Sequence, residues 1–138
     1  MIEFLLDTNI VSELTKRVPN PTVLRHFRDR VGTYAIGAPT WHELMFGLQR
    51  LPDSRRRVEF ERYFRQLIQS DVPVLAYDHL CAEWHAAERA RLVRIGRTPP
   101  YADGEIAAIA AVYGIRLVTA NVKDFEGFQG ISIENWFR

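Results

Sequence analysis

The beginning of the chain constrains the fold more than any other stretch, because a short apolar run there stops at a carboxylate. The run Ile2–Leu6, interrupted only by Glu3, is too short for a helix and predicts a buried strand. It ends at Asp7, and from Ile10 onward apolar residues recur at helical spacing, with Thr8 as a candidate N-cap. An acid between a buried strand and a helix lies at the edge of an α/β sheet, where such folds bind ligands, although Asp is also a favoured helix cap.

The rest of the chain alternates between short apolar segments and longer amphipathic ones. Further strands are predicted at Thr33–Ile36, Val72–Ala76, Ile115–Thr119 and Ile131–Ile133. Further helices are predicted at Thr22–Arg30, Thr40–Arg50, Arg55–Gln69, Asp78–Gly96 and Asp103–Tyr113, with a short turn or helical piece at Asp124–Phe128. This alternation predicts an α/β fold in which helices cover both faces of a parallel sheet.

The length and composition fit one globular domain spanning residues 1–138. Hydrophobic residues make up 47% of the chain, enough for a full core, and a net charge of +1 gives no overall basic field. No run is long enough to cross a membrane and no secretory signal opens the chain, so a cytoplasmic location is expected. Arginines nevertheless gather in two clusters, Arg55–Arg57 and Arg89, Arg91, Arg94 and Arg97.

Four acids are placed around the predicted strand ends: Asp7, Glu43, Asp103 and Asp124. Asp7 follows the first strand, Glu43 lies one turn into the helix after the second, and Asp124 lies just beyond the fourth. Asp103 opens the helix that precedes the fourth strand, and the start of that helix can face the same edge. Because the carboxyl ends of parallel strands meet at one edge of a sheet, these acids are predicted to converge on one cleft.

Each of these acids also has a purely structural explanation. Glu43 follows Thr40 at the spacing of a capping box. Asp103 in a first helical turn suits the helix dipole, and Asp124 is also typical of an ordinary turn. Any single acid is weak evidence for a site, whereas four at these topological positions favour a shared one.

The residue types in this set indicate a hard divalent cation. Carboxylates held close together repel and raise one another's pKa, and a bound Mg²⁺ or Mn²⁺ relieves that repulsion. Mg²⁺ takes oxygen ligands and commonly combines a few carboxylates with water and phosphate oxygens. The chemistry that this set supports is metal-assisted attack of water on a phosphodiester.

Other kinds of site find no support. The single Cys81 excludes an intramolecular disulfide and a multi-cysteine zinc site. The chain contains no P-loop, no GxGxxG and no GxSxG nucleophile motif. The four histidines lack a metal-binding spacing, and each is expected at the surface or at an interface: His26, His42, His79 and His85.

Several sequence pieces, in this order and spacing, carry a resemblance to a known family. They are Phe4-Leu5-Leu6-Asp7-Thr8-Asn9; Thr40-x-x-Glu43-Leu44 with Gly47; Pro100-x-x-Asp103-Gly104-x-Ile106-Ala107-Ala108; Leu117-Val118-Thr119-Ala120-Asn121-x-x-Asp124-Phe125; and Ile133-Glu134-Asn135-Trp136. Over nearly its whole length, the chain resembles the PIN-domain ribonucleases, and most closely the VapC-like toxins of type II toxin–antitoxin pairs.

The resemblance implies a three-layer α/β/α fold around a central parallel sheet of about five strands. It implies an Mg²⁺- or Mn²⁺-dependent endoribonuclease that acts as a homodimer and is silenced by a cognate antitoxin. The catalytic and metal-binding acids of the family fall on Asp7, Glu43, Asp103 and Asp124. Supporting polar groups are implied at Thr8, Asn9, Thr119 and Asn121.

Some alternatives stay open at this point. A structure-specific DNase and a non-catalytic PIN module that binds RNA or protein are the competing functions. Arg89, Arg91 and Arg94 either contact RNA phosphates or an acidic antitoxin segment, or form a solvated helix face. The apolar side chains crowded on two neighbouring helices predict that a homodimer uses these helices: Trp41, Met45, Phe46, Phe60 and Phe64.

Overall fold

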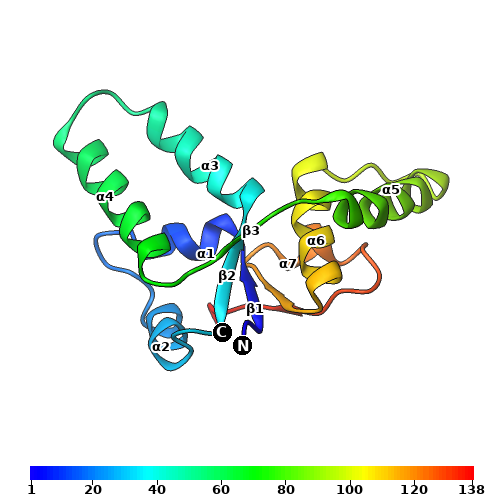
Figure 1. Ribbon diagram of the computed structural model, residues 1–138, viewed down its shortest axis with the longest axis horizontal. Coiled ribbons are helices and arrows are strands. Elements are labelled where there is room, and N and C mark those ends of the chain that lie inside the picture. Colours follow the sequence, from blue (N-terminus) through cyan, green and yellow to red (C-terminus); the bar gives the residue numbers. More distant parts are fainter.

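A sheet of five parallel strands forms the centre of the computed structural model, which describes residues 1–138 (Figure 1). The strands are β1 (Phe4–Leu6), β2 (Tyr34–Gly37), β3 (Val74–Leu75), β4 (Arg116–Val118) and β5 (Ile133–Glu134). Their order across the sheet is β3-β2-β1-β4-β5, and every neighbouring pair is parallel. The predicted parallel sheet is confirmed, and the first strand of the chain lies in its middle.

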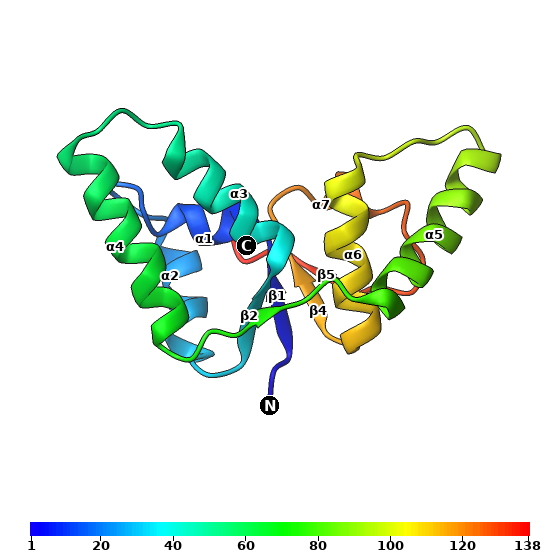
Figure 2. The same ribbon diagram turned by 45° about the horizontal axis from the view of Figure 1, so that its top comes forward.

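Helices cover both faces of this sheet. They are α1 (Thr8–Glu13), α2 (Pro21–Asp29), α3 (Ala38–Gln49), α4 (Arg55–Gln69), α5 (His79–Arg94), α6 (Tyr101–Tyr113) and α7 (Val122–Phe125). The helices α1 to α4 lie on one side of the sheet and α5 to α7 on the other (Figures 1 and 2). This is the predicted three-layer α/β/α arrangement. None of the helices combines the length and the apolar character that crossing a membrane requires.

Side chains of the central strand alternate between two hydrophobic cores. Phe4 and Leu6 belong to the core under α1 to α4, which also holds Trp136, whereas Leu5 belongs to the core under α5 to α7. All three strand residues are buried. A strand buried on both faces needs apolar residues at every position, which explains why the run before Asp7 is continuous rather than alternating.

The register of β1 with its two neighbours aligns the carboxyl ends of the three strands. Leu6 on β1 lies opposite Ile36 on β2 and Val118 on β4. The backbone N–H of Asp7 donates to the carbonyl oxygen of Val118 at 2.9 Å, which continues the ladder one step beyond β1. Asp7 and Thr119, which follow the paired residues, therefore emerge side by side at one edge of the sheet.

Two helix starts near this edge differ from the prediction. The side chain of Asp7 caps α1 by accepting a hydrogen bond from the Thr8 N–H at 2.8 Å, so Thr8 is not the cap. Helix α3 begins at Ala38, because the proline that follows is well suited to a first helical turn. Thr40 is therefore inside the helix and fully buried, and the predicted capping box with Glu43 is wrong. The other boundaries shift by a few residues only.

A buried histidine lies at the contact between α5 and α6. His85 is only 4% exposed, and its Nδ1 is 2.9 Å from the hydroxyl of Tyr77. A Cβ at Gly104 would overlap the His85 ring, so this close approach of the two helices requires glycine. The expectation of a surface or interface histidine is wrong for His85, whereas His42 and His79 are exposed.

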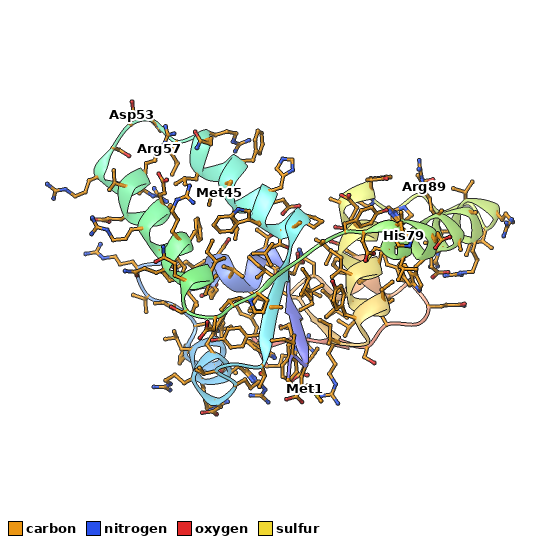
Figure 3. All side chains as sticks on the ribbon, in the orientation of Figure 1. Met1, Met45, Asp53, Arg57, His79 and Arg89 are labelled. Carbon is orange, nitrogen blue, oxygen red and sulfur yellow. The ribbon has the colours of Figure 1, made fainter.

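Each arginine cluster contains one residue whose guanidinium pairs with an acid of its own chain. Arg57 pairs with Asp53 at 3.2 Å at the outer end of the α3–α4 hairpin (Figure 3). Arg91 pairs with Glu88 at 2.7 Å and donates to the carbonyl oxygen of Gly127, also at 2.7 Å. Arg91 therefore fastens α5 to the segment after α7, and the side chains of the Arg89–Arg97 cluster are not equally available to a partner.

We predict that Gly104→Ala lowers the free energy of unfolding by about 1–3 kcal/mol, because the added methyl group overlaps the buried His85 ring. Urea unfolding of the purified variant measures this change. Gly47→Ala is the matched control, since a Cβ there meets no atom within 4 Å on α3. That control is expected to be neutral or to stabilise by about 0.5–1 kcal/mol. Equal losses of stability in the two variants would contradict the steric explanation.

Candidate active site

Three hydrogen bonds hold the carboxylate of Asp7, which is only 7% exposed. Its Oδ1 accepts from the Thr8 N–H at 2.8 Å. Its Oδ2 accepts from the Asn9 amide at 3.0 Å and from the Thr119 hydroxyl at 2.9 Å. The carbonyl oxygen of the Asn9 side chain accepts from the Ala120 N–H at 2.9 Å, so Asn9 also ties α1 to the end of β4. The carboxylate is therefore fixed in one orientation at the edge of the sheet.

Burial and hydrogen bonding act in opposite directions on this acid. Burial raises the pKa of Asp7 above its ordinary value, the bonds from Thr119, Thr8 and Asn9 oppose that rise, and the nearby charge of Glu43 adds to it. Hydrogen bonds to an ionised carboxylate favour its charged form, so the three donors preserve the charge that burial disfavours. Asp7 is a carboxylate that the protein both buries and stabilises.

Glu43 reaches the site from α3, as the sixth residue of that helix. Its Oε2 accepts a hydrogen bond from the Thr8 hydroxyl at 2.7 Å. Thr8 thus contacts two of the four acids, through its backbone N–H to Asp7 and through its side chain to Glu43. The side chain of Glu43 is exposed, in contrast to that of Asp7.

Asp103 lies in the first turn of α6, as predicted, and its pKa reports on its surroundings. Partial burial raises the pKa of Asp103 to about 6, with further contributions from the negative charges of Asp7, Asp124 and Glu43, in that order. Asp7, Asp124 and Glu43 therefore all lie near enough to Asp103 for their charges to act on it. The four acids come from four elements or element ends: β1, α3, α6 and α7.

Asp124 and Asn121 occupy the segment that follows β4. Asp124 is on the short helix α7 and is exposed. Asn121, predicted to support the acids, contributes its backbone N–H, which donates to the Thr119 hydroxyl at 3.0 Å. Because that hydroxyl itself donates to Asp7, the turn at Asn121 positions the bond of Thr119 to Asp7 rather than touching the acid.

The donor set fits a hard divalent cation. Its charged groups are all carboxylates, which are the ligands that Mg²⁺ and Mn²⁺ prefer, and their mutual repulsion is what a cation offsets. No three His, Cys, Asp or Glu side chains in the structure stand close enough together to form a complete protein ligand group. Mg²⁺ rarely needs a complete set of protein ligands, because one or two carboxylates usually hold it while water and substrate phosphate complete its coordination shell.

Comparisons with known proteins identify the family of this chain. The PIN domain matches residues 4–129, and the chain belongs to the PIN-domain family. It is 32% identical to the tRNA(fMet)-specific endonuclease VapC of Shigella flexneri, over 99% of both chains. It is also 32% identical to the VapC ribonuclease Y4jK of Sinorhizobium fredii, over 95% of each. Within the PIN-domain family, the chain therefore falls among the VapC ribonucleases.

Solved structures show the same fold. The DNA-bound VapBC of Salmonella typhimurium matches with a TM-score of 0.85 and 31% identity, over 99% of both chains. FitAcB of Neisseria gonorrhoeae matches with a TM-score of 0.88 and 25% identity, over 98% of this chain and 99% of that one. These matches confirm the three-layer α/β/α architecture over nearly the whole length.

We predict that the free energy of unfolding depends on pH through Asp103. Because the folded state raises the pKa of Asp103 from 3.8 to about 6, the folded protein binds the proton more tightly, and this stabilisation is lost as pH rises through that range. Asp103→Asn is expected to be more stable than the wild type at pH 7, by about 1 kcal/mol after allowance for solvent screening of a half-exposed group. The difference should shrink toward pH 4. Urea unfolding of both proteins at pH 7 and pH 4, with chelator present, measures this difference in stability. A difference that does not change with pH would contradict the prediction.

Proposed function

We propose that this chain is an endoribonuclease that hydrolyses RNA phosphodiester bonds at the four acids, with Mg²⁺ or Mn²⁺ bound there. The observation that carries the proposal is the placement of the acids around Asp7: Asp7 lies beside Thr119 at the end of β1, and Glu43 shares Thr8 with it. The charges of Asp7, Asp124 and Glu43 also add to the effect of burial in raising the pKa of Asp103. Membership of the PIN-domain family and the similarity to VapC ribonucleases support it.

Each group has a distinct part in the proposed reaction. A divalent cation, when bound, supplies the positive charge that activates a water molecule and stabilises the phosphate during attack. Asp7, fixed by its three hydrogen bonds, and Asp103 are the proposed principal ligands. Glu43, oriented by Thr8, and Asp124, exposed on α7, are proposed to complete the site through direct or water-mediated contacts. Such outer contacts orient metal ligands and tune their basicity.

A cognate antitoxin is the proposed protein partner. The structural neighbours include VapBC of Salmonella typhimurium and a toxin–antitoxin complex from Klebsiella pneumoniae. We therefore propose that this chain is the toxin component of a type II toxin–antitoxin pair. The single domain over residues 1–138 and the cytoplasmic location stay predictions of the sequence.

The alternatives are less well supported. A non-catalytic PIN module would be expected to lack some of the acids or to scatter them, whereas here three of the acids lie near enough to Asp103 for their charges to act on it. A structure-specific DNase shares the metal chemistry, but the two relatives described above are named for RNA cleavage. Substrate choice is therefore part of the test that follows.

We predict that Asp103→Asn reduces RNA cleavage by orders of magnitude while the fold stays intact, because one negative charge is removed from the metal site. The assay is cleavage of structured cellular RNAs and of matched DNA by purified protein, with and without chelator, followed by addition of Mg²⁺ or Mn²⁺. Asp53→Asn is the control, since it removes an exposed acid at the far end of the α3–α4 hairpin (Figure 3). Equal cleavage by wild type and Asp103→Asn, or cleavage that ignores the chelator, would defeat the metal-nuclease proposal.

Fewer of the apolar side chains predicted to form a homodimer contact are exposed than the sequence indicated. Phe64 is buried, and Trp41, Met45 and Phe60 pack against the core of their own chain. Phe46 alone of the predicted set is mostly exposed, at 55%, with the Arg50 guanidinium 5.3 Å from its ring centroid. Any dimer contact through α3 and α4 is therefore expected to centre on Phe46.

We predict that the protein is dimeric at micromolar concentration and that Phe46→Ser weakens the dimer, because it removes an exposed apolar anchor. Light scattering coupled to size exclusion gives the mass. Val93→Ser is the matched control, since Val93 is 53% exposed on α5, across the sheet from α3. A monomer mass for the wild type would contradict the prediction.

A further inference from the structure

A cavity of about 310 Å³ adjoins the acids at Asp124. Its walls come from the loop between α5 and α6, which supplies Arg97 and two consecutive prolines, and from α7 and the residues just after it, which supply Lys123, Asp124 and Phe128. Its volume is at the lower end of the range that holds small-molecule ligands, about 300–1,000 Å³. No sequence pattern distinguishes Lys123, and Arg97 stands out in the sequence only as a member of an arginine cluster.

The two cations of this cavity are available for a ligand. Neither Arg97 nor Lys123 forms an ion pair or a side-chain hydrogen bond in the structure, and both side chains are exposed. Arg91, from the same cluster as Arg97, is by contrast occupied by Glu88. Asp124 is the single acid among the residues that line the cavity.

The guanidinium of Arg97 packs against the backbone at Gly127. A Cβ at Gly127 would lie 3.3 Å from Nη1 of Arg97, so the guanidinium rests directly over this glycine. The carbonyl oxygen of Gly127 is held by Arg91, which fixes the surface on which Arg97 lies. Lys123 and Asp124 also line a second hollow of about 350 Å³. Lys123 therefore borders two hollows next to Asp124.

The negative charge of the acid cluster gives Arg97 and Lys123 a possible role in binding phosphate. Four carboxylates at one edge repel the phosphates of an approaching nucleic acid, and a single divalent cation offsets only part of that charge. Cations at the rim of the acid cluster would attract the backbone and define where it lies. Arg presents a planar fork suited to phosphate oxygens, and Lys acts as a point charge.

We infer that Arg97 and Lys123 form a binding site for the phosphate of a nucleotide next to the scissile bond. The inference rests on the proposed function, since it places a neighbouring phosphate of the same RNA strand. Asp124 links the two sites, because it belongs to the acid cluster and also lines the cavity. Arg97 and Lys123 are thus positioning residues, which hold the strand in register while the acids and their cation act on the adjacent phosphate.

The first test measures binding of a short fluorescent oligouridine to the Asp103→Asn protein by anisotropy at several salt concentrations with Mg²⁺ present. Adding Arg97→Gln and Lys123→Gln is expected to weaken binding about tenfold at low salt. Because one phosphate is then no longer neutralised by the protein, the slope of log affinity against log salt, which is negative, should also become less steep by about 0.7. Arg25→Gln with Arg28→Gln, added to the same protein, is the matched control, because both arginines are exposed on α2, on the other side of the sheet, and neither lines the cavity. Equal weakening by the control pair and by the Arg97 and Lys123 pair, or no weakening by either, would overturn the inference.

The second test locates the phosphate. A neutral methylphosphonate linkage is moved one position at a time along an RNA whose cleavage site the wild type has defined. One neutral linkage next to the scissile bond should weaken binding to the Asp103→Asn protein. It should not weaken binding once Arg97→Gln and Lys123→Gln have been added, because the linkage and these substitutions remove the same interaction. Equal weakening of both proteins at every position would overturn the inference. A wild type that cuts no RNA would defeat the proposed function. The oligouridine test needs no cleavage, so it would still show whether Arg97 and Lys123 bind a phosphate.

Discussion

The candidate site depends on the hydrogen bonds that hold the buried carboxylate of Asp7. An ionised carboxylate is costly to remove from water unless its oxygens are satisfied, and here the Thr8 N–H, Asn9 and Thr119 satisfy them. Two of these donors are neighbours in the sequence, whereas Thr119 is 112 residues away. Their meeting requires β1 and β4 to be adjacent and parallel. The central place of β1 in the sheet is therefore a condition for the site as well as for the fold.

Stability and chemistry have opposite requirements at this edge of the sheet. The fold brings negative charges near one another, and burial together with this repulsion raises the pKa of Asp103. The two hydrophobic cores on either side of the sheet compensate for it, since β1 contributes fully buried side chains to both. A site that is electrostatically unfavourable for the isolated chain is favourable for binding a cation, because the repulsion falls when positive charge enters.

The sequence predicted those features that local patterns determine. The apolar run before Asp7 predicted a buried strand, and alternation with amphipathic helices predicted the parallel sheet. The shared site of the four acids, which was inferred from that sheet, stays a prediction. The patterns failed where tertiary contacts decide. Thr40 has the spacing of a capping residue, but α3 starts earlier and buries it. His85 resembles any polar helix residue, because the glycine that makes room for its ring belongs to another helix.

The contact between His85 and Gly104 has a consequence for genetic studies of this protein. Helix α5 supplies none of the four acids, yet its histidine packs directly against the residue after Asp103 and so determines how far α6 stands from α5. A screen that collects inactive variants would recover changes at His85 and Gly104 together with changes at the acids. From the loss of activity alone, His85 would then be mistaken for a catalytic residue. Its contacts with Gly104 and with the Tyr77 hydroxyl are instead those of a packing residue between helices.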